Sequence, residues 1–262
     1  METGFVRGVI PPIITPVDGD ERVDEGALRR MVDHVITGGV HGILSLGSNG
    51  EFFGLDRDEQ QRAVAVTMDQ TAGRVPVYVG IGAISTKECV RTAAMAGSLG
   101  AQAITILPPM FLSPNDEELY RHFLAVAEST DLPVLLYNNP DRMRVNLSAS
   151  LVERLADVPN IVGVKDSSGD LVLTAEYIRR TRSKGFRVLA GDLEGALEAQ
   201  YRLAPLRIAF NLGSFPVVTK EALNLLGFRV GEPIRPNTRC TEANRAKLRD
   251  VLVQVGALQE GS

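Results

Sequence analysis

The feature that most constrains the fold is a regular alternation between short apolar runs and longer stretches with helical apolar spacing. The helical stretches place apolar residues three and four positions apart, as in Leu28, Met31 and Val35, which favours helix over strand. The short runs are apolar almost without a break, as expected for parallel strands that helices cover. The alternation therefore predicts an α/β fold. The runs begin near Val9, Gly42, Val75, Ala101, Leu132, Ile161 and Phe186, roughly 30 residues apart. The predicted helices between them span residues 25–37, 57–71, 87–96, 117–127, 148–155 and 172–180.

The chain length of 262 residues fits a (β/α)8 barrel, which takes about 250 residues. A doubly wound open sheet is the alternative, but it calls for a glycine-rich turn after the first strand, where Val9–Pro16 carries prolines. After Gly191 the pattern changes to three helices, predicted at 193–206, 219–226 and 241–255. Residues 207–212 are the one candidate for an eighth strand, but they continue a helical pattern. We therefore predict seven strands and a helical tail, in a single domain.

Charge and composition exclude several classes of protein. The net charge is -4 with a pI near 5.5, and no cluster of Lys or Arg suggests nucleic-acid binding. No apolar run approaches the ~20 residues of a membrane span, and no secretory signal precedes the first run. Cys89 and Cys240 provide neither a disulfide framework nor a metal pair. A cytoplasmic protein without membrane contact is expected.

Two polar side chains end adjacent predicted strands, where barrel enzymes place their chemistry. Lys165 follows the apolar residues Ile161–Val164, and Tyr137 ends the run that precedes it in the chain. A partly desolvated lysine is a usable amine nucleophile, and a nearby phenol can move protons. The alternatives without a catalytic role are a lysine that extends into solvent and a core tyrosine whose hydroxyl lies at the solvent-exposed edge of the sheet.

Two glycine-rich turns are candidate ligand-binding loops. Gly47-Ser48-Asn49-Gly50-Glu51 follows the second run, and its backbone amides could hold a carboxylate, although a plain turn is the simpler interpretation. Gly80-Ile81-Gly82 offers only a weak dinucleotide signal, because the third glycine is absent. The three histidines, His34, His41 and His122, have no zinc spacing, and no metal or cofactor motif is present.

Taken together, these stretches resemble the dihydrodipicolinate synthase/N-acetylneuraminate lyase family of pyruvate-dependent class I aldolases. The resemblance runs from residue 5 to 192 in the family's order and roughly its spacing, and the tail through 216–226 is also similar to the family's C-terminal helices. The matching stretches are Gly8–Pro16, Gly47–Glu51, Leu135–Pro140, Ile161–Ser167 and Ala190–Asp192.

The resemblance implies a Schiff-base lyase, a carbon-carbon lyase without metal or organic cofactor. Lys165 corresponds to the lysine that forms an imine with pyruvate or a 2-oxo acid, and Tyr137 to the proton-relay tyrosine. Gly47, Ser48 and Asn49 correspond to the turn that binds the pyruvate carboxylate. Arg142 matches the arginine that contacts the second substrate's carboxylate in synthase members. The family also implies a homo-oligomer, a tetramer or a dimer.

Three departures from the family pattern bear on function. Pro108–Phe111 carries no tyrosine where synthase members have a pair, and Ser48-Asn49 replaces their Thr-Thr. Both favour an aldolase for 4-hydroxy-2-oxo or 2-keto-3-deoxy acids over 4-hydroxy-tetrahydrodipicolinate synthase, which stays the alternative. The family pattern also predicts about one βα module more after Asp192 than this sequence contains, so we expect seven barrel strands with their helices in residues 1–192 and the helical region in residues 193–262. A non-catalytic family member with a binding or assembly role is the third possibility.

Overall fold

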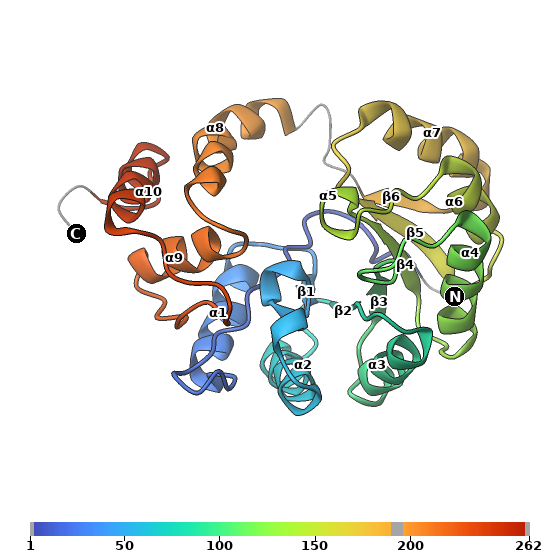
Figure 1. The fold of residues 1–262 in the computed structure, drawn as a ribbon, viewed down its shortest axis with the longest axis horizontal. Helices are drawn as coiled ribbons and strands as arrows, with labels where there is room; N and C mark the ends of the chain where they lie inside the picture. The colour runs from blue at the N-terminus through green and yellow to red at the C-terminus, as the bar shows by residue number, and fades with distance from the viewer. Residues whose placement is uncertain (1–2, 190–195, 260–262) are drawn as a thin grey trace.

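The computed structural model describes residues 3–189 and 196–259, with side chains described outside 196–202. Within these residues, six parallel strands form one open sheet in the order β1-β2-β3-β4-β5-β6, so every neighbour in the sheet is also the next strand in the chain. Because each crossover carries a helix, the sheet curves inside an arc of helices (Figure 1). The strands are β1 (Ile43–Ser45), β2 (Val77–Ile81), β3 (Ala103–Ile106), β4 (Val134–Asn138), β5 (Ile161–Asp166) and β6 (Arg187–Leu189).

The helices of the arc agree closely with the predicted spans, except for the short α5, which was not predicted. Side-chain caps explain where several begin, since Asp24, Asp56, Ser85 and Asn115 each accept a bond from a backbone amide of the first turn. The helices are α1 (Glu25–Thr37), α2 (Arg57–Thr71), α3 (Thr86–Ser98), α4 (Asp116–Glu128), α5 (Pro140–Met143), α6 (Ala149–Leu155) and α7 (Leu171–Thr181). Short 3-10 turns are η1 (Ser48–Gly50), η2 (Phe52–Gly54), η3 (Arg182–Lys184) and η4 (Phe210–Leu212).

The first of the seven predicted strands is a correction. The run that begins at Val9 makes a single parallel bridge, Pro12 to Leu44, and is not a regular strand. Its path is still that of a barrel strand, because Ile13 N donates to Leu44 O and Leu44 N donates to Pro11 O, both at 3.0 Å. Pro11 and Pro12 have no amide hydrogen, so the ladder cannot extend through them.

The predicted absence of the eighth strand is confirmed over the described residues. Residues 207–212 are helical: α8 (Ala196–Ala209) runs into η4, as the periodicity predicted. Residues 190–195, which include the start of the predicted helix 193–206, lie outside the described part of the chain. No described strand pairs with the free side of β6, and Figure 1 shows the arc open between α7 and α8.

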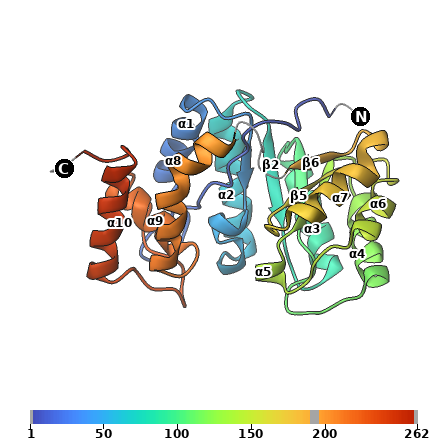
Figure 2. The ribbon, with the colours of Figure 1, turned by 90° about the horizontal axis from the view of Figure 1, so that it is seen from above.

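The tail forms a small helical layer of its own. With α8 it comprises α9 (Val217–Leu225) and α10 (Glu242–Gln254), and Figure 2 shows the three helices side by side at one end of the molecule. Their shared core contains Ala209, Val218, Leu248 and Leu252. The segment between α9 and α10 returns to the barrel, because Val230 and Ile234 are buried in the same core as the sheet and the outer helices.

Candidate active site

Lys165 and Tyr137 lie side by side at the carboxyl end of the sheet. The β4–β5 register places them opposite each other, so both project from the same face. The Lys165 ammonium nitrogen lies 4.0 Å from the centre of the Tyr137 ring, and the tyrosine is only 6% exposed. Lys165 itself is half-buried. The structure therefore brings together the two residues that the sequence pointed to as nucleophile and proton carrier.

The environment of Tyr137 alters its acidity. Burial raises the pKa of the phenol, but the positive charge of Lys165 and hydrogen bonds with Ser167, Asn139 and Lys165 outweigh it, so the pKa lies below its ordinary value. One of these bonds runs from Asn139 Nδ2 to the phenol oxygen at 3.0 Å. A phenol with a lowered pKa gives up its proton more readily near neutral pH, as a proton relay requires.

This acidity can be measured directly. The pKa of free tyrosine is about 10, and we expect Tyr137 to ionise at a lower pH than that. Burial instead raises the pKa of Tyr78 and Tyr177. Ultraviolet titration of tyrosinate, compared with Tyr137→Phe, isolates this group, and Lys165→Met should move its midpoint upward. Between the lowered pKa and about 10 the unfolded chain holds more protons, so the contribution of Tyr137 to stability grows as pH rises. An unchanged midpoint in Lys165→Met would mean that the lysine charge does not act on this phenol.

Behind the strand ends lies a buried polar network that sequence reasoning missed. Asn138 Nδ2 donates to Asp166 Oδ1 at 3.1 Å and to Tyr177 Oη at 3.2 Å, while Asn138 Oδ1 accepts from Leu147 N at 3.0 Å. The Asp166 carboxylate also accepts from the Thr174 hydroxyl. The network ties β4 and β5 to α7 immediately beside Lys165 and Tyr137. Its only sequence signal was that polar residues directly follow both candidates.

The turn at Gly47–Glu51 adopts a compact, unusual backbone. Ser48–Gly50 form η1, Glu51 has the left-handed φ of 51°, and Asn49 Nδ2 donates to Pro12 O at 3.4 Å. The buried oxygen Asn49 Oδ1 has no hydrogen-bond partner within the described structure. Buried polar atoms usually have a partner, so this oxygen is an exception within the turn.

The Glu51 side chain fixes this turn to the C-terminal tail. Its carboxylate is fully buried, accepts from Ile234 N at 3.0 Å and forms an ion pair with Lys220, which is 1% exposed. Lys220 Nζ also donates to Glu232 O at 2.9 Å. Burial lowers the pKa of Lys220, and the Glu51 carboxylate opposes that shift. The sequence marked Glu51 only as the end of a motif and gave no role to Lys220.

Arg142 lies on α5 and contacts the C-terminal tail. It is exposed and places its guanidinium carbon 4.5 Å from the centre of the Phe215 ring in the tail. The described contacts do not join it to Lys165 or Tyr137.

The structure gives no support to Gly80-Ile81-Gly82 as a dinucleotide-binding loop. Gly80 and Ile81 are part of β2, and a Cβ on Gly80 would lie 2.3 Å from the Leu46 carbonyl oxygen. Close packing of β2 against the turn explains this glycine. The histidines also have local partners: Thr86 with His122, Val9 N with His41, and the Phe228 ring with His34. No group of three or more potential metal ligands occurs among the residues described.

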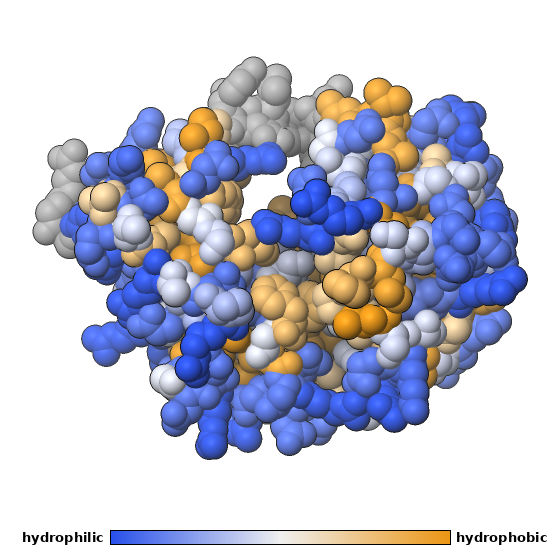
Figure 3. All heavy atoms as spheres, viewed as in Figure 1, coloured by the Kyte–Doolittle hydropathy of each residue, from blue (hydrophilic) through white to orange (hydrophobic). Residues whose placement is uncertain are grey.

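A cavity of about 680 Å³ lies along the inner face of the sheet beside Lys165. In a closed barrel this interior is filled by layers of side chains from all strands, so the missing strand leaves it open. Figure 3 shows the molecule hollowed between the α8 side and the α5–α7 side. The walls of the cavity beside Lys165 include Val9, Ile10, Leu44, Tyr78, Thr105, Leu135, Val188 and Leu189.

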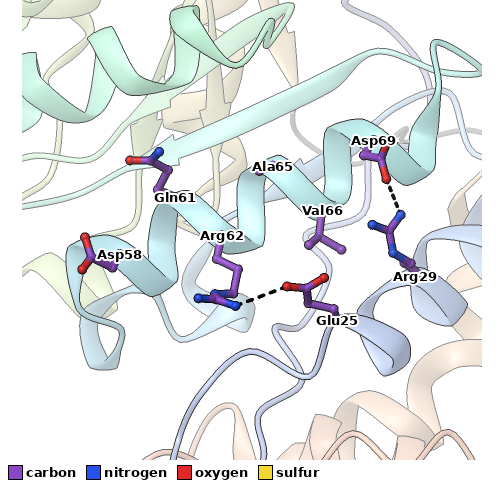
Figure 4. Close-up of a pocket in the computed structure, with 8 residues that line it drawn as sticks. All are labelled: Glu25, Arg29, Asp58, Gln61, Arg62, Ala65, Val66 and Asp69. Carbon is purple, nitrogen blue, oxygen red and sulfur yellow. Dashed lines mark hydrogen bonds and ion pairs between the residues drawn. The ribbon is translucent and has the colours of Figure 1, made fainter.

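A second hollow, of about 580 Å³, lies on the outer surface between α1 and α2. Two ion pairs cross it, with Arg62 3.3 Å from Glu25 and Arg29 2.5 Å from Asp69 (Figure 4). These pairs are solvent-exposed and offer no desolvated nucleophile. The cavity beside Lys165 is therefore the candidate active site.

A parallel α/β barrel that carries a lysine beside a tyrosine at its carboxyl edge has the architecture of class I aldolases, a class of carbon-carbon lyases. A model of the dihydrodipicolinate synthetase family matches residues 5–193. The chain belongs to this family, which uses a pyruvate-dependent class I aldolase chemistry.

Two relatives support the assignment. A 4-hydroxy-tetrahydrodipicolinate synthase of Methanothrix thermoacetophila is 34% identical over 290 aligned positions, covering 96% of this chain and 98% of the relative. The synthase of Methylococcus capsulatus is 40% identical over 194 residues, covering 74% of this chain and 66% of its own. An alignment of 290 positions exceeds the 262 residues of the chain, so the first relative contains residues that have no counterpart here.

Solved structures agree in fold. The chloride-inhibited dihydrodipicolinate synthase from Acinetobacter baumannii, complexed with pyruvate, has a TM-score of 0.90 at 29% identity, covering 97% of this chain and 100% of its own. A monomeric dihydrodipicolinate synthase variant has a TM-score of 0.90 at 28% identity and covers 97% and 99%. Within the described part of the chain, no helix is long and apolar enough to cross a membrane.

Proposed function

We propose that the chain catalyses a carbon–carbon bond reaction of pyruvate through an imine on Lys165. The observation that carries the proposal is the Lys165 ammonium seated 4.0 Å from the Tyr137 ring at the mouth of an open cavity. The neutral lysine amine attacks the ketone carbon, and loss of water gives the imine. The protonated imine then withdraws electrons from the adjacent carbon, so that a proton leaves and an enamine forms.

The remaining residues have distinct roles in this proposal. Tyr137 carries protons to and from the oxygen that leaves and the carbon that reacts, which its lowered pKa assists. The turn of Gly47, Ser48 and Asn49 holds the pyruvate carboxylate, and Arg142 receives the carboxylate of the second substrate. The enamine adds to an aldehyde, after which water releases the product from the lysine.

The synthase reaction is the favoured form of this chemistry. The relatives described above are named 4-hydroxy-tetrahydrodipicolinate synthases, which supports that reaction over the cleavage of 2-keto-3-deoxy acids. One observation keeps an aldolase for 4-hydroxy-2-oxo acids as a second candidate. Residues 108–111 contain no tyrosine, and Phe111 is 94% exposed where synthase members have a relay pair. The expected cytoplasmic location and homo-oligomeric state are part of the proposal; sedimentation of the purified chain tests the latter.

Borohydride trapping tests the central step. Incubation with pyruvate and then borohydride reduces the imine to a stable secondary amine, and we expect mass spectrometry of peptides to place the added mass on Lys165. The same reaction with 4-hydroxy-2-oxo acids, followed by assay for released aldehyde, separates the two candidate reactions. A folded protein that gives no adduct with any of these acids would favour the non-catalytic binding or assembly role instead.

A further inference from the structure

The C-terminal tail reaches the substrate turn through a buried charge pair. Glu51 is the residue after η1, and its side chain contacts two groups of the tail: the Lys220 ammonium on α9 and the backbone amide of Ile234 in the loop after α9. Lys220 in turn donates to the Glu232 carbonyl oxygen in the same loop. Neither charged side chain is more than 1% exposed. A buried charge without its partner is costly, so the pair constrains both segments at once.

The other face of the same turn is held by the first segment of the chain. Asn49 donates to Pro12 O, and a Cβ at Gly50 would lie 3.2 Å from Ile13 O, which shows how closely the turn packs there. Glu51 has a left-handed backbone, with a φ of 51°, and its side chain reaches the tail. That conformation is unfavourable for a residue with a side chain and persists only when its surroundings impose it.

We infer that Lys220 is a positioning residue for substrate binding: by holding Glu51 it fixes the Ser48–Asn49 turn in the geometry that receives the substrate carboxylate. This inference rests on the proposed function, because that function assigns the carboxylate to the turn. It also gives the tail a task in the reaction. One βα module is missing, but α9 still contacts the barrel. Through Lys220 it supports the substrate turn, although α9 belongs to the C-terminal tail and not to the βα units of the barrel.

The test separates positioning from simple stabilisation. Glu51→Asp retains the charge for Lys220 but shortens the side chain by one methylene, so the turn must shift for the same contacts to form. We expect the pyruvate concentration that gives half-maximal borohydride trapping to rise about tenfold, equivalent to about 1.4 kcal/mol, with little change in the maximal trapping rate. The double variant Glu51→Gln/Lys220→Met removes both charges and should show the same rise without leaving a single buried charge.

Arg235→Met provides the matched control. Arg235 also joins the tail to the N-terminal region, through a 2.8 Å ion pair with Glu21, but it is exposed and does not contact the turn. We expect its half-maximal pyruvate concentration to equal that of the parent chain. If Glu51→Asp and the double variant are folded by circular dichroism and saturate like the parent, the positioning role is wrong and the pair is purely structural. If the parent itself forms no adduct, the proposed function fails instead.

Discussion

Replacing Lys165 by methionine is expected to abolish the borohydride-trapped pyruvate adduct and to reduce kcat/KM by about 10⁴-fold or more. The reason is that the amine forms the covalent bond itself, and removing a covalent nucleophile can cost about 10⁶ in rate. Methionine keeps most of the side-chain volume in a half-buried position, so the fold should persist. Trapping, turnover of pyruvate and circular dichroism are the measurements.

Two companion variants make the result specific. Lys165→Arg keeps a positive charge above the Tyr137 ring but offers no usable nucleophile, because a guanidinium stays protonated. It should therefore lose the adduct as completely as methionine does. Lys184→Met removes a lysine that pairs with Asp157 at 2.6 Å, away from the sheet mouth, and should trap pyruvate normally. An adduct that survives in Lys165→Met would assign the chemistry to another amine.

Lys220→Met alone should lower the free energy of unfolding by about 3–5 kcal/mol. It leaves the fully buried Glu51 carboxylate without its counter-charge, in a place where water cannot replace the lost partner. Urea denaturation followed by circular dichroism measures the effect. Adding Glu51→Gln to Lys220→Met should recover part of the loss, because the second change removes the uncompensated charge.

The exposed pair between Arg235 and Glu21 again serves for comparison, since its arginine side chain is 79% exposed. Water and salt screen such a pair, so Arg235→Met should leave the urea midpoint almost unchanged. If Lys220→Met unfolded at the same urea concentration as the parent, solvent would have to reach Glu51 in the folded state, and its burial would be refuted.

Elements that depend on local pattern were predicted well. The spans of α1 and α2 agree with the apolar periodicity residue for residue. Prediction failed where a local signal was ambiguous. The helix predicted at 148–155 begins one residue later, because Ser148 is its cap. The bridge at Pro12 likewise replaced a predicted strand because prolines interrupt the ladder.

The candidate site divides in the same way. Lys165 and Tyr137 could be paired in advance because parallel strands that follow each other in the chain end at the same edge of the sheet. The stacking of Arg142 on Phe215 and the network around Asp166 could not be predicted, because they depend on how a loop, a helix and the tail pack together.

The sequence by itself determined the order of strand and helix, the family, the lysine at the end of a buried strand, and the loss of one module. These properties follow from spacing and residue type over a few turns of chain. Only the tertiary structure decided that Glu51 and Lys220 meet, that the tail contacts the Gly47–Glu51 turn, and that a cavity stays open beside Lys165. The physical reason is that the strength of a charge pair and the size of a cavity depend on which groups lose water together. That is decided when distant segments pack, and no local pattern records it.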